Sequence, residues 1–207
     1  MRERLLLVIA AIPAILLPAG CESERTDTKV EVRSDTTAQD DEKGRIADDI
    51  AKLATGKDLS AALDAKTFGD AKDRLIRRGS RIETTLIDSL RRSDDWGVRL
   101  GVIEVLMATG TRISVDHLIT VLDDPQPLVA LRANTLLVEM TQHSEIPTAG
   151  APTAANGLPP VPKPAAGDLA LDAEERQWAF WQRANGKTLR AAWASWWTAN
   201  QGTVEIK

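Results

Sequence analysis

The chain has few residues that carry redox or metal chemistry. Its 207 residues include one Cys, two His and no Tyr. A single Cys excludes an internal disulfide and any zinc site built from paired thiolates. Gly-rich phosphate loops, a GxSxG nucleophile elbow and Cys/His metal spacings are also absent from the sequence. We therefore expect a protein that is not an enzyme and that needs no cofactor and no metal.

An excess of basic charge is missing as well. Lys plus Arg number 26 and Asp plus Glu number 30, which gives a formal net charge of −4. A dedicated nucleic-acid binder normally has a strongly basic face that displaces phosphate counterions, so no nucleic-acid partner is expected. Hydrophobic residues make up 43% of the chain, which is enough for a packed core and excludes disorder throughout.

The remaining titratable residues have structural explanations. His117 and His143 lie in unlike contexts and have no HExxH-like spacing, which is typical of surface or interface histidines. Asp94-Asp95 and Asp123-Asp124 precede helical segments, where Asp caps exposed backbone amides. We interpret both pairs as caps, with metal binding or acid–base chemistry as the alternative. The sequence therefore offers no catalytic residue.

Long hydrophobic runs are scarce, and the clearest one stands near the start. It extends from Leu5 to Leu17, interrupted only by Pro13, and is shorter than the roughly 20 residues of a transmembrane helix. Its length suits an export signal. The run ends in Leu17-Pro18-Ala19-Gly20-Cys21, which resembles a bacterial lipoprotein signal: Ala19, Gly20 and Cys21 match, and Pro18 stands where Leu is usual.

The resemblance implies that residues 1–20 are a lipoprotein signal peptide. Cys21 would then carry a diacylglycerol on its sulfur and a fatty acid such as palmitate on its new amino group, so that the membrane is a partner through this lipid. Glu22 is not the Asp that retains lipoproteins at the inner membrane of enteric bacteria. The resemblance thus favours the bacterial cell envelope, on the periplasmic side of the outer membrane rather than at the inner membrane. A structural or free thiol is the alternative for Cys21.

Residues 21–43 are rich in Ser, Thr, Asp and Glu. From Glu22 to Glu42, three basic residues stand against eight acidic ones. Such a segment buries too little apolar surface to offset its ordering entropy. It is predicted to be a disordered acidic tether.

Residues 44–145 have apolar positions three and four apart, which predicts helices. Ser80 and Glu83 have the spacing of a capping box. Two patterns recur at an offset of 31 to 32 residues: Leu86-Ile87-Asp-Ser-Leu90 as Leu118-Ile119-Thr-Val-Leu122, and Val98, Val102, Leu106 as Val129, Ala133, Leu137. A repeat of this length with two helices per unit predicts stacked helical hairpins.

This segment resembles HEAT repeats, in which a turn rich in Asp and Pro precedes Val-Arg at the start of a second helix. Val98-Arg99 after Asp94-Asp95 matches this pattern. Asp123-Asp124-Pro125 with Val129 matches in part, because Ala130 replaces the Arg. The resemblance implies an all-α fold with a short HEAT-like α-solenoid. A four-helix bundle is the alternative.

Residues 146–168 contain six prolines and predict a semi-rigid linker without core residues. A docking ligand for another protein is the alternative for this segment. Residues 169–207 hold five of the six Trp residues, and two short helices joined at Asn185-Gly186 are expected there. This ending resembles the Trp-rich C-terminal helix of bacterial HEAT-repeat proteins, which implies a cap on the open end of the solenoid.

The expected function is a non-catalytic, membrane-anchored scaffold that binds an envelope protein. The alternative is a lipoprotein that binds the cell wall or a polysaccharide, a glycan partner, through an exposed face of Trp193, Trp196 and Trp197. An enzyme on a helical-repeat scaffold is a third possibility. It fits export poorly, because the known substrates of HEAT-like enzymes are intracellular.

Overall fold

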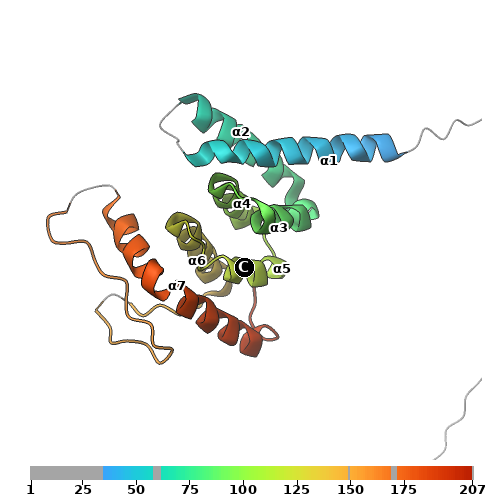
Figure 1. Ribbon diagram of the computed structural model, residues 1–207. Coiled ribbons are helices and arrows are strands. Elements are labelled where there is room, and N and C mark those ends of the chain that lie inside the picture. Colours follow the sequence, from blue (N-terminus) through green and yellow to red (C-terminus); the bar gives the residue numbers. More distant parts are fainter. Residues whose placement is uncertain (1–34, 58–61, 149, 169–171, 207) are drawn as a thin grey trace, which may run out of the picture. The chain divides into compact units, whose positions relative to one another are not determined.

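The computed structural model describes residues 35–57, 62–148, 150–168 and 172–206, and Cys21 lies outside these ranges. All regular structure in them is helical and no strand occurs there, which confirms the expected all-α fold. The elements are α1 (Asp35–Lys52), the 3₁₀ helix η1 (Leu53–Lys57), α2 (Ala62–Arg78), the 3₁₀ helix η2 (Gly79–Ile82), α3 (Glu83–Arg92), α4 (Trp96–Thr109), α5 (Arg112–Thr120), α6 (Pro127–Thr141) and α7 (Ala173–Asn200) (Figure 1). Within the same ranges, no helix combines the length and the hydrophobicity needed to span a bilayer.

The helices of residues 36–207 pack in a regular order. Helix α4 contacts η1, α2 and α3 on one side and α6 on the other, and α6 contacts α5 and α7. In Figure 1 the pairs α1–α2, α3–α4 and α5–α6 follow one another, with α7 beyond α6. The core extends through all of them and includes the fully buried side chains of Leu53, Leu75, Leu86, Leu106, Leu118, Leu137 and Trp193.

The buried positions follow the internal repeat. Val98, Val102 and Leu106 of α4 are buried, and so are Val129, Ala133 and Leu137 of α6. The residues that recur in the sequence are therefore the ones that pack between helices, as the repeat predicts.

Helix α4 and η1 cross at very close range, because two glycines of α4 face η1. A Cβ atom on Gly101 would lie 2.6 Å from the Cβ of Leu53, and one on Gly97 would lie 2.7 Å from the carbonyl oxygen of Ala54. Interiors are packed too densely to absorb such overlaps without displacement. Because Gly97 and Gly101 have no side chains, η1 and α4 can lie this close together.

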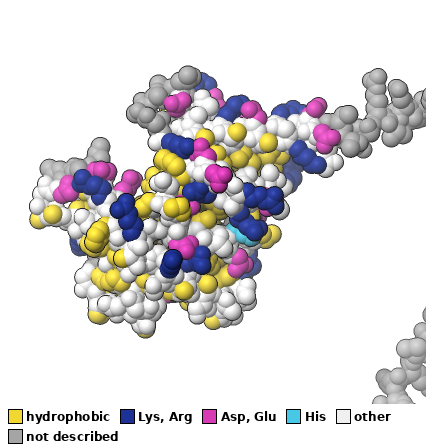
Figure 2. Space-filling view, in the orientation of Figure 1, with side chains coloured by type: hydrophobic (Ala, Val, Ile, Leu, Met, Phe, Trp, Pro, Cys, Tyr) yellow, Lys and Arg dark blue, Asp and Glu magenta, His cyan; other side chains and the backbone are white. Residues whose placement is uncertain are grey.

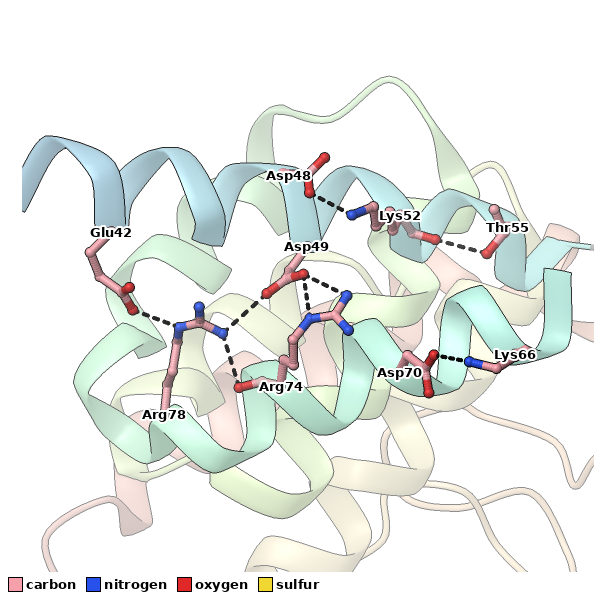
Figure 3. A network of polar contacts seen from close by, with 9 residues as sticks. All are labelled: Glu42, Asp48, Asp49, Lys52, Thr55, Lys66, Asp70, Arg74 and Arg78. Atoms are coloured by element: carbon pink, nitrogen blue, oxygen red, sulfur yellow. Dashed lines mark hydrogen bonds and ion pairs between the residues drawn. The ribbon is translucent and has the colours of Figure 1, made fainter. Parts of the chain in front are cut away.

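A polar network joins α1 to α2 (Figure 3). Asp49 is 4% exposed and accepts hydrogen bonds from Arg74 at 2.8 Å and from Arg78 at 3.1 Å. Arg78 also donates to Glu42 at 2.8 Å, and this hydrogen bond lowers the pKa of the Glu42 carboxyl. Two cations thus compensate the buried carboxylate of Asp49, which would otherwise be costly to bury.

The N-terminal limit of the folded part differs from the expectation. The disordered tether was predicted to reach residue 43, but α1 begins at Asp35, so this prediction is wrong for residues 35–43. Composition alone misjudged the segment, because Glu42 pairs with Arg78 and with Arg45 of its own helix. Ile46 and Ile50 of the same helix are buried and join it to the apolar core.

The predicted capping box is also wrong. Ser80 lies in η2, and α3 begins after Ile82 without a side-chain cap. The Glu83 carboxylate instead accepts hydrogen bonds from the backbone N–H of Thr111 at 2.7 Å and from the Ser114 hydroxyl at 2.5 Å, at the start of α5. Glu83 therefore bonds to the start of α5, far along the chain, instead of to the start of its own helix.

The C-terminal part forms one helix rather than two. Helix α7 is continuous from Ala173 to Asn200, so the expected turn at Asn185-Gly186 is absent. Gly186 serves close packing, because a Cβ atom there would lie 3.3 Å from the carbonyl oxygen of Leu122. The Pro-rich segment likewise contains a core residue that was not expected, since Leu158 is fully buried.

Substitution of Gly101 by Ala tests the crossing. The added methyl group overlaps Leu53, so we expect a loss of about 1–3 kcal/mol in the free energy of unfolding, measured by urea denaturation. Gly44→Ala is the matched control, because no atom lies within 4 Å of a Cβ there, and it should stabilise α1 by about 0.5–1 kcal/mol. A Gly101→Ala protein as stable as the wild type would show that the crossing does not limit packing.

Candidate functional site

A groove lies between α6, the N-terminal half of α7 and the Pro-rich segment; we name it the α6–α7 groove. One part has a volume of about 520 Å³ and is lined by Leu131, Arg132, Val161, Pro162, Lys163, Pro164, Glu174, Glu175 and Trp178. The adjoining part has a volume of about 250 Å³ and is lined by Trp96, Gln126, Pro127, Leu128, Leu131, Asp172, Glu175, Arg176, Trp178, Ala179 and Arg183. Because Leu131, Glu175 and Trp178 line both parts, we treat them as one site.

The floor of the groove is apolar and its rim is charged. Leu128, Leu131 and Val161 are partly exposed at the edge of the core. On the rim, the exposed Glu175 and Arg183 form no ion pair within the ranges that the structure describes. Figure 2 shows basic and acidic side chains interspersed on the visible face of the molecule, without a large field of one sign. An apolar floor with a mixed-charge rim is the usual composition of a protein-binding surface.

Two tryptophans fix the walls of the groove. The Trp178 indole N–H donates to the carbonyl oxygen of Pro127 at 2.8 Å, which holds α7 against the start of α6. The Trp181 indole N–H donates to the carbonyl oxygen of Pro159 at 3.0 Å, which holds the Pro-rich segment against α7. Both indoles are buried, so these two hydrogen bonds are shielded from water.

Trp96 enters the groove from α4, and its position depends on a helix cap. The Asp95 side chain accepts hydrogen bonds from the backbone N–H groups of Gly97 at 2.8 Å and Val98 at 3.3 Å, which starts α4 at Trp96. Lys57 donates to the other Asp95 oxygen at 2.5 Å and lies over the Trp96 ring. Partial burial opposes ionisation of Asp95, but the hydrogen bonds from Lys57, Gly97 and Val98 outweigh it and lower the pKa of this carboxyl.

The three tryptophans predicted to bind lie at the C-terminal end of α7, away from this groove. Trp193 is 0% exposed and donates to Asn134 of α6 at 3.1 Å. Trp197 is 2% exposed, its indole N–H has no partner among the described residues, and Arg112 of α5 lies over its ring. Neither indole can offer a ring face to a glycan in this structure.

Trp196 alone of the three keeps a partly exposed ring. It stacks on His143, with ring centroids 3.9 Å apart and planes 1° from parallel. His143 also contacts Glu145 at 2.7 Å through Nε2. An aromatic platform of three exposed indoles is therefore not formed, and the burial of Trp193 and Trp197 agrees with a packing role at the end of the helical series.

The cap prediction is confirmed for Asp95 in α4 and is wrong for Asp123-Asp124, because the N-cap of α6 is Gln126, without a side-chain cap. Asp124 accepts two hydrogen bonds from Arg99, at 2.8 and 2.9 Å, and one from the backbone N–H of Gln126 at 2.8 Å. Asp123 pairs with Arg190 of α7 at 3.0 Å. In the described ranges no three His, Cys, Asp or Glu side chains come together as a metal site. His117 lies half-buried on α5, apart from His143.

Sequence reasoning missed the groove, although the sequence contains a signal for it. Leu128 and Leu131 of α6 lie outside the buried stripe of Val129, Ala133 and Leu137, and Trp96 lies outside the matching stripe of α4. Large apolar residues beside a complete core stripe indicate a second apolar face on the same helix. Only the structure shows that α7 and the Pro-rich segment turn this face into a groove.

Comparison of the sequence with protein-family models and with curated proteins found no match, and comparison of the structure with solved structures found none either.

Trp193 and Trp196 should differ in their effect on stability. Trp193→Ala removes a fully buried indole and should lower the free energy of unfolding by about 3–5 kcal/mol in urea denaturation. Trp196→Ala is the comparison and should cost clearly less, because that ring is partly exposed. Equal losses, or quenching of Trp193 fluorescence by iodide in the native protein, would contradict the burial described above.

The Asp95 cap should give a defined pH dependence. Asp95→Ala should cost about 1 kcal/mol at neutral pH, and Asp95→Asn should cost less because it keeps a cap acceptor. The native pKa of Asp95 lies below its usual value of 3.8, so its charge-dependent stabilisation is present above that value and is lost as the pH falls through the native pKa. Urea denaturation of the wild type and the Asn variant should converge in acid, and a difference that persists there would refute the assignment.

Proposed function

We propose that the protein is a membrane-anchored bacterial lipoprotein that acts as a non-catalytic scaffold. Its helices would form a short HEAT-like solenoid, and the α6–α7 groove would bind a protein partner in the envelope. The observation that carries this proposal is the groove itself. It has an apolar floor of Leu128 and Leu131, a partly exposed Trp96 and two rim charges, Glu175 and Arg183, that form no ion pair within the described residues.

The packing order supports the solenoid over a closed four-helix bundle. The two repeated pairs lie side by side, with α3 against α5 and α4 against α6. The series continues on both sides, because η1 and α2 pack on α4 and α7 packs on α6. A closed bundle would leave no apolar face for these additional elements, whereas a stack of hairpins needs a cap at each end.

A buried polar contact between the repeats also supports HEAT-like stacking. Arg99 follows Val98 at the start of α4 and reaches Asp124 in the turn before α6. This contact connects the Val-Arg of one unit to the Asp of the next. It gives a physical role to the residues on which the resemblance rests.

The groove supports binding of a protein rather than a glycan. Glycan recognition by the C-terminal tryptophans would need exposed rings, and Trp193 and Trp197 are buried. The groove instead offers apolar side chains, prolines and both charge signs, which fit an amphipathic segment of a polypeptide.

A lipid on Cys21 would explain how a small groove with weak affinity for its partner protein can still be occupied. Each buried methylene of an acyl chain contributes about 0.8 kcal/mol, so two or three chains hold a protein firmly at a membrane. Confinement there raises the local concentration of groove and partner, and it compensates for a weak contact.

Site-specific photocrosslinking in cells tests anchor and groove together. A photoreactive amino acid at position 128, in the groove, should trap one envelope protein, whereas the same group at the exposed position 84 on α3 should not. Leu131→Asp should abolish the crosslink, and Ile113→Asp should not, because Ile113 is 61% exposed and lies outside the groove. Cys21→Ala should release the protein from membranes and reduce the crosslink.

Three results would overturn parts of this proposal. Sedimentation of Cys21→Ala with membranes as efficiently as the wild type would remove the lipid anchor. Crosslinks from position 84 equal to those from position 128 would remove the groove. Recovery of glycan fragments in place of a protein would favour the cell-wall alternative.

A further inference from the structure

The exposed side of α7 differs in composition from the rest of the described surface. Residues 176–200 contain four Arg and Lys residues and no Asp or Glu. Arg176, Phe180, Arg183 and Lys187 lie at spacings of four, three and four, which places them on one side of the helix, and all four are exposed. We name this set the outer face of α7. The buried Trp178, Leu189 and Trp193 lie on the opposite side of the helix.

We propose that the outer face of α7 binds an anionic lipid surface. This inference rests on the proposed function, because a lipid on Cys21 would keep the domain near a bilayer. It adds a second, peripheral contact that turns the domain relative to the membrane.

The exposure of Phe180 has no explanation in the packing of the domain. It is 73% exposed, more than the other exposed large hydrophobic side chains of the described part, Met107 and Ile113. It packs in no groove of α7, and basic residues stand four positions before it and three and seven positions after it. At a bilayer interface, Lys and Arg contact the anionic headgroups while a ring such as that of Phe180 enters the boundary of the acyl chains.

The ion pairs leave the centre of this face basic. Arg176 pairs with Asp168 at 2.9 Å and with Asp172 at 3.8 Å, and Arg190 pairs with Asp123 at 3.0 Å. Arg183 and Lys187 form no ion pair within the described residues. They line a shallow hollow with Asp123 and Asp124, whose carboxylates pair with Arg190 and Arg99. Arg183 thus follows Phe180 by one turn of the helix and Lys187 follows it by two turns, on the same side of α7.

An anionic bilayer fits this arrangement better than a second copy of the chain. The carboxylates that border the outer face, Asp123, Asp168 and Asp172, already pair with Arg190 and Arg176, so two copies would bring mainly like charges together. Anionic headgroups supply the missing charge, and each Lys or Arg near such a surface strengthens binding about fivefold. The contact is weak alone, but an anchor in the same membrane would make it intramolecular.

Vesicle co-sedimentation tests this surface without the lipid anchor. The full chain with Cys21→Ala is mixed with vesicles of phosphatidylcholine containing phosphatidylglycerol, and with vesicles of phosphatidylcholine alone. We expect binding to the anionic vesicles only, and weaker binding as salt is added. Arg183→Gln with Lys187→Gln should weaken binding more than tenfold, and Phe180→Ala should weaken it about fivefold at every salt concentration.

The matched control removes the same charge elsewhere. Arg77→Gln with Arg91→Gln changes two exposed cations on α2 and α3 and should leave vesicle binding unchanged. Equal binding to both vesicle types, or equal losses in the two double variants, would overturn the inference. So would self-association of the protein that Phe180→Ala abolishes while vesicle binding is absent, because a second copy would then cover this face. None of these results depends on Cys21 acylation or on the groove crosslink, so the two proposals fail separately.

Discussion

The close crossing of η1 and α4 is the contact on which the rest of the fold depends. Gly97 and Gly101 let the backbone of η1 approach α4, and α4 in turn contacts α2, α3 and α6. The same first turn of α4 presents Trp96 to the groove, next to the Asp95 cap. A larger residue at position 97 or 101 would displace α4, and the groove wall would move with it.

Polar side chains then set the register between successive helices. Asp49 with Arg74 joins α1 to α2, Glu83 with Ser114 joins α3 to α5, and Arg99 with Asp124 joins α4 to the turn before α6. Apolar contacts alone would tolerate sliding, because they lack direction. A buried charge that loses its partner is strongly destabilising, so each of these contacts permits a single alignment. Positional specificity along the helical series therefore comes from a few buried hydrogen bonds.

The sequence predicted the helical class, the repeated core positions and the Asp95 cap, because these depend on neighbours within one or two turns. It failed where a distant residue decided the outcome. Glu83 accepts a hydrogen bond from the backbone N–H at the start of α5 instead of capping its own helix. Gly186 allows close packing against Leu122 instead of forming a turn. Glu42 pairs with Arg78, which holds the first turns of α1 against α2. The groove was missed for the same reason. Trp96, Leu128 and Leu131 are ordinary apolar residues until α7 and the Pro-rich segment lie beside them.

Helix α7 contributes to two surfaces, the α6–α7 groove and the outer face, and Arg176 and Arg183 lie where the two meet. The Trp-rich side of α7 packs against the domain. The indole N–H groups of Trp178, Trp181 and Trp193 donate hydrogen bonds to the carbonyl oxygens of Pro127 and Pro159 and to the Asn134 side chain, respectively. These contacts fix the rotation of the helix about its axis, and the rotation decides that Phe180, Arg183 and Lys187 face outward. Loss of one indole hydrogen bond would therefore alter both the groove wall and the basic face. In an anchored protein neither surface needs high affinity, since two weak contacts that share one tether act as a single stronger one. The rigid attachment of α7 would let both proposed contacts form at the same time.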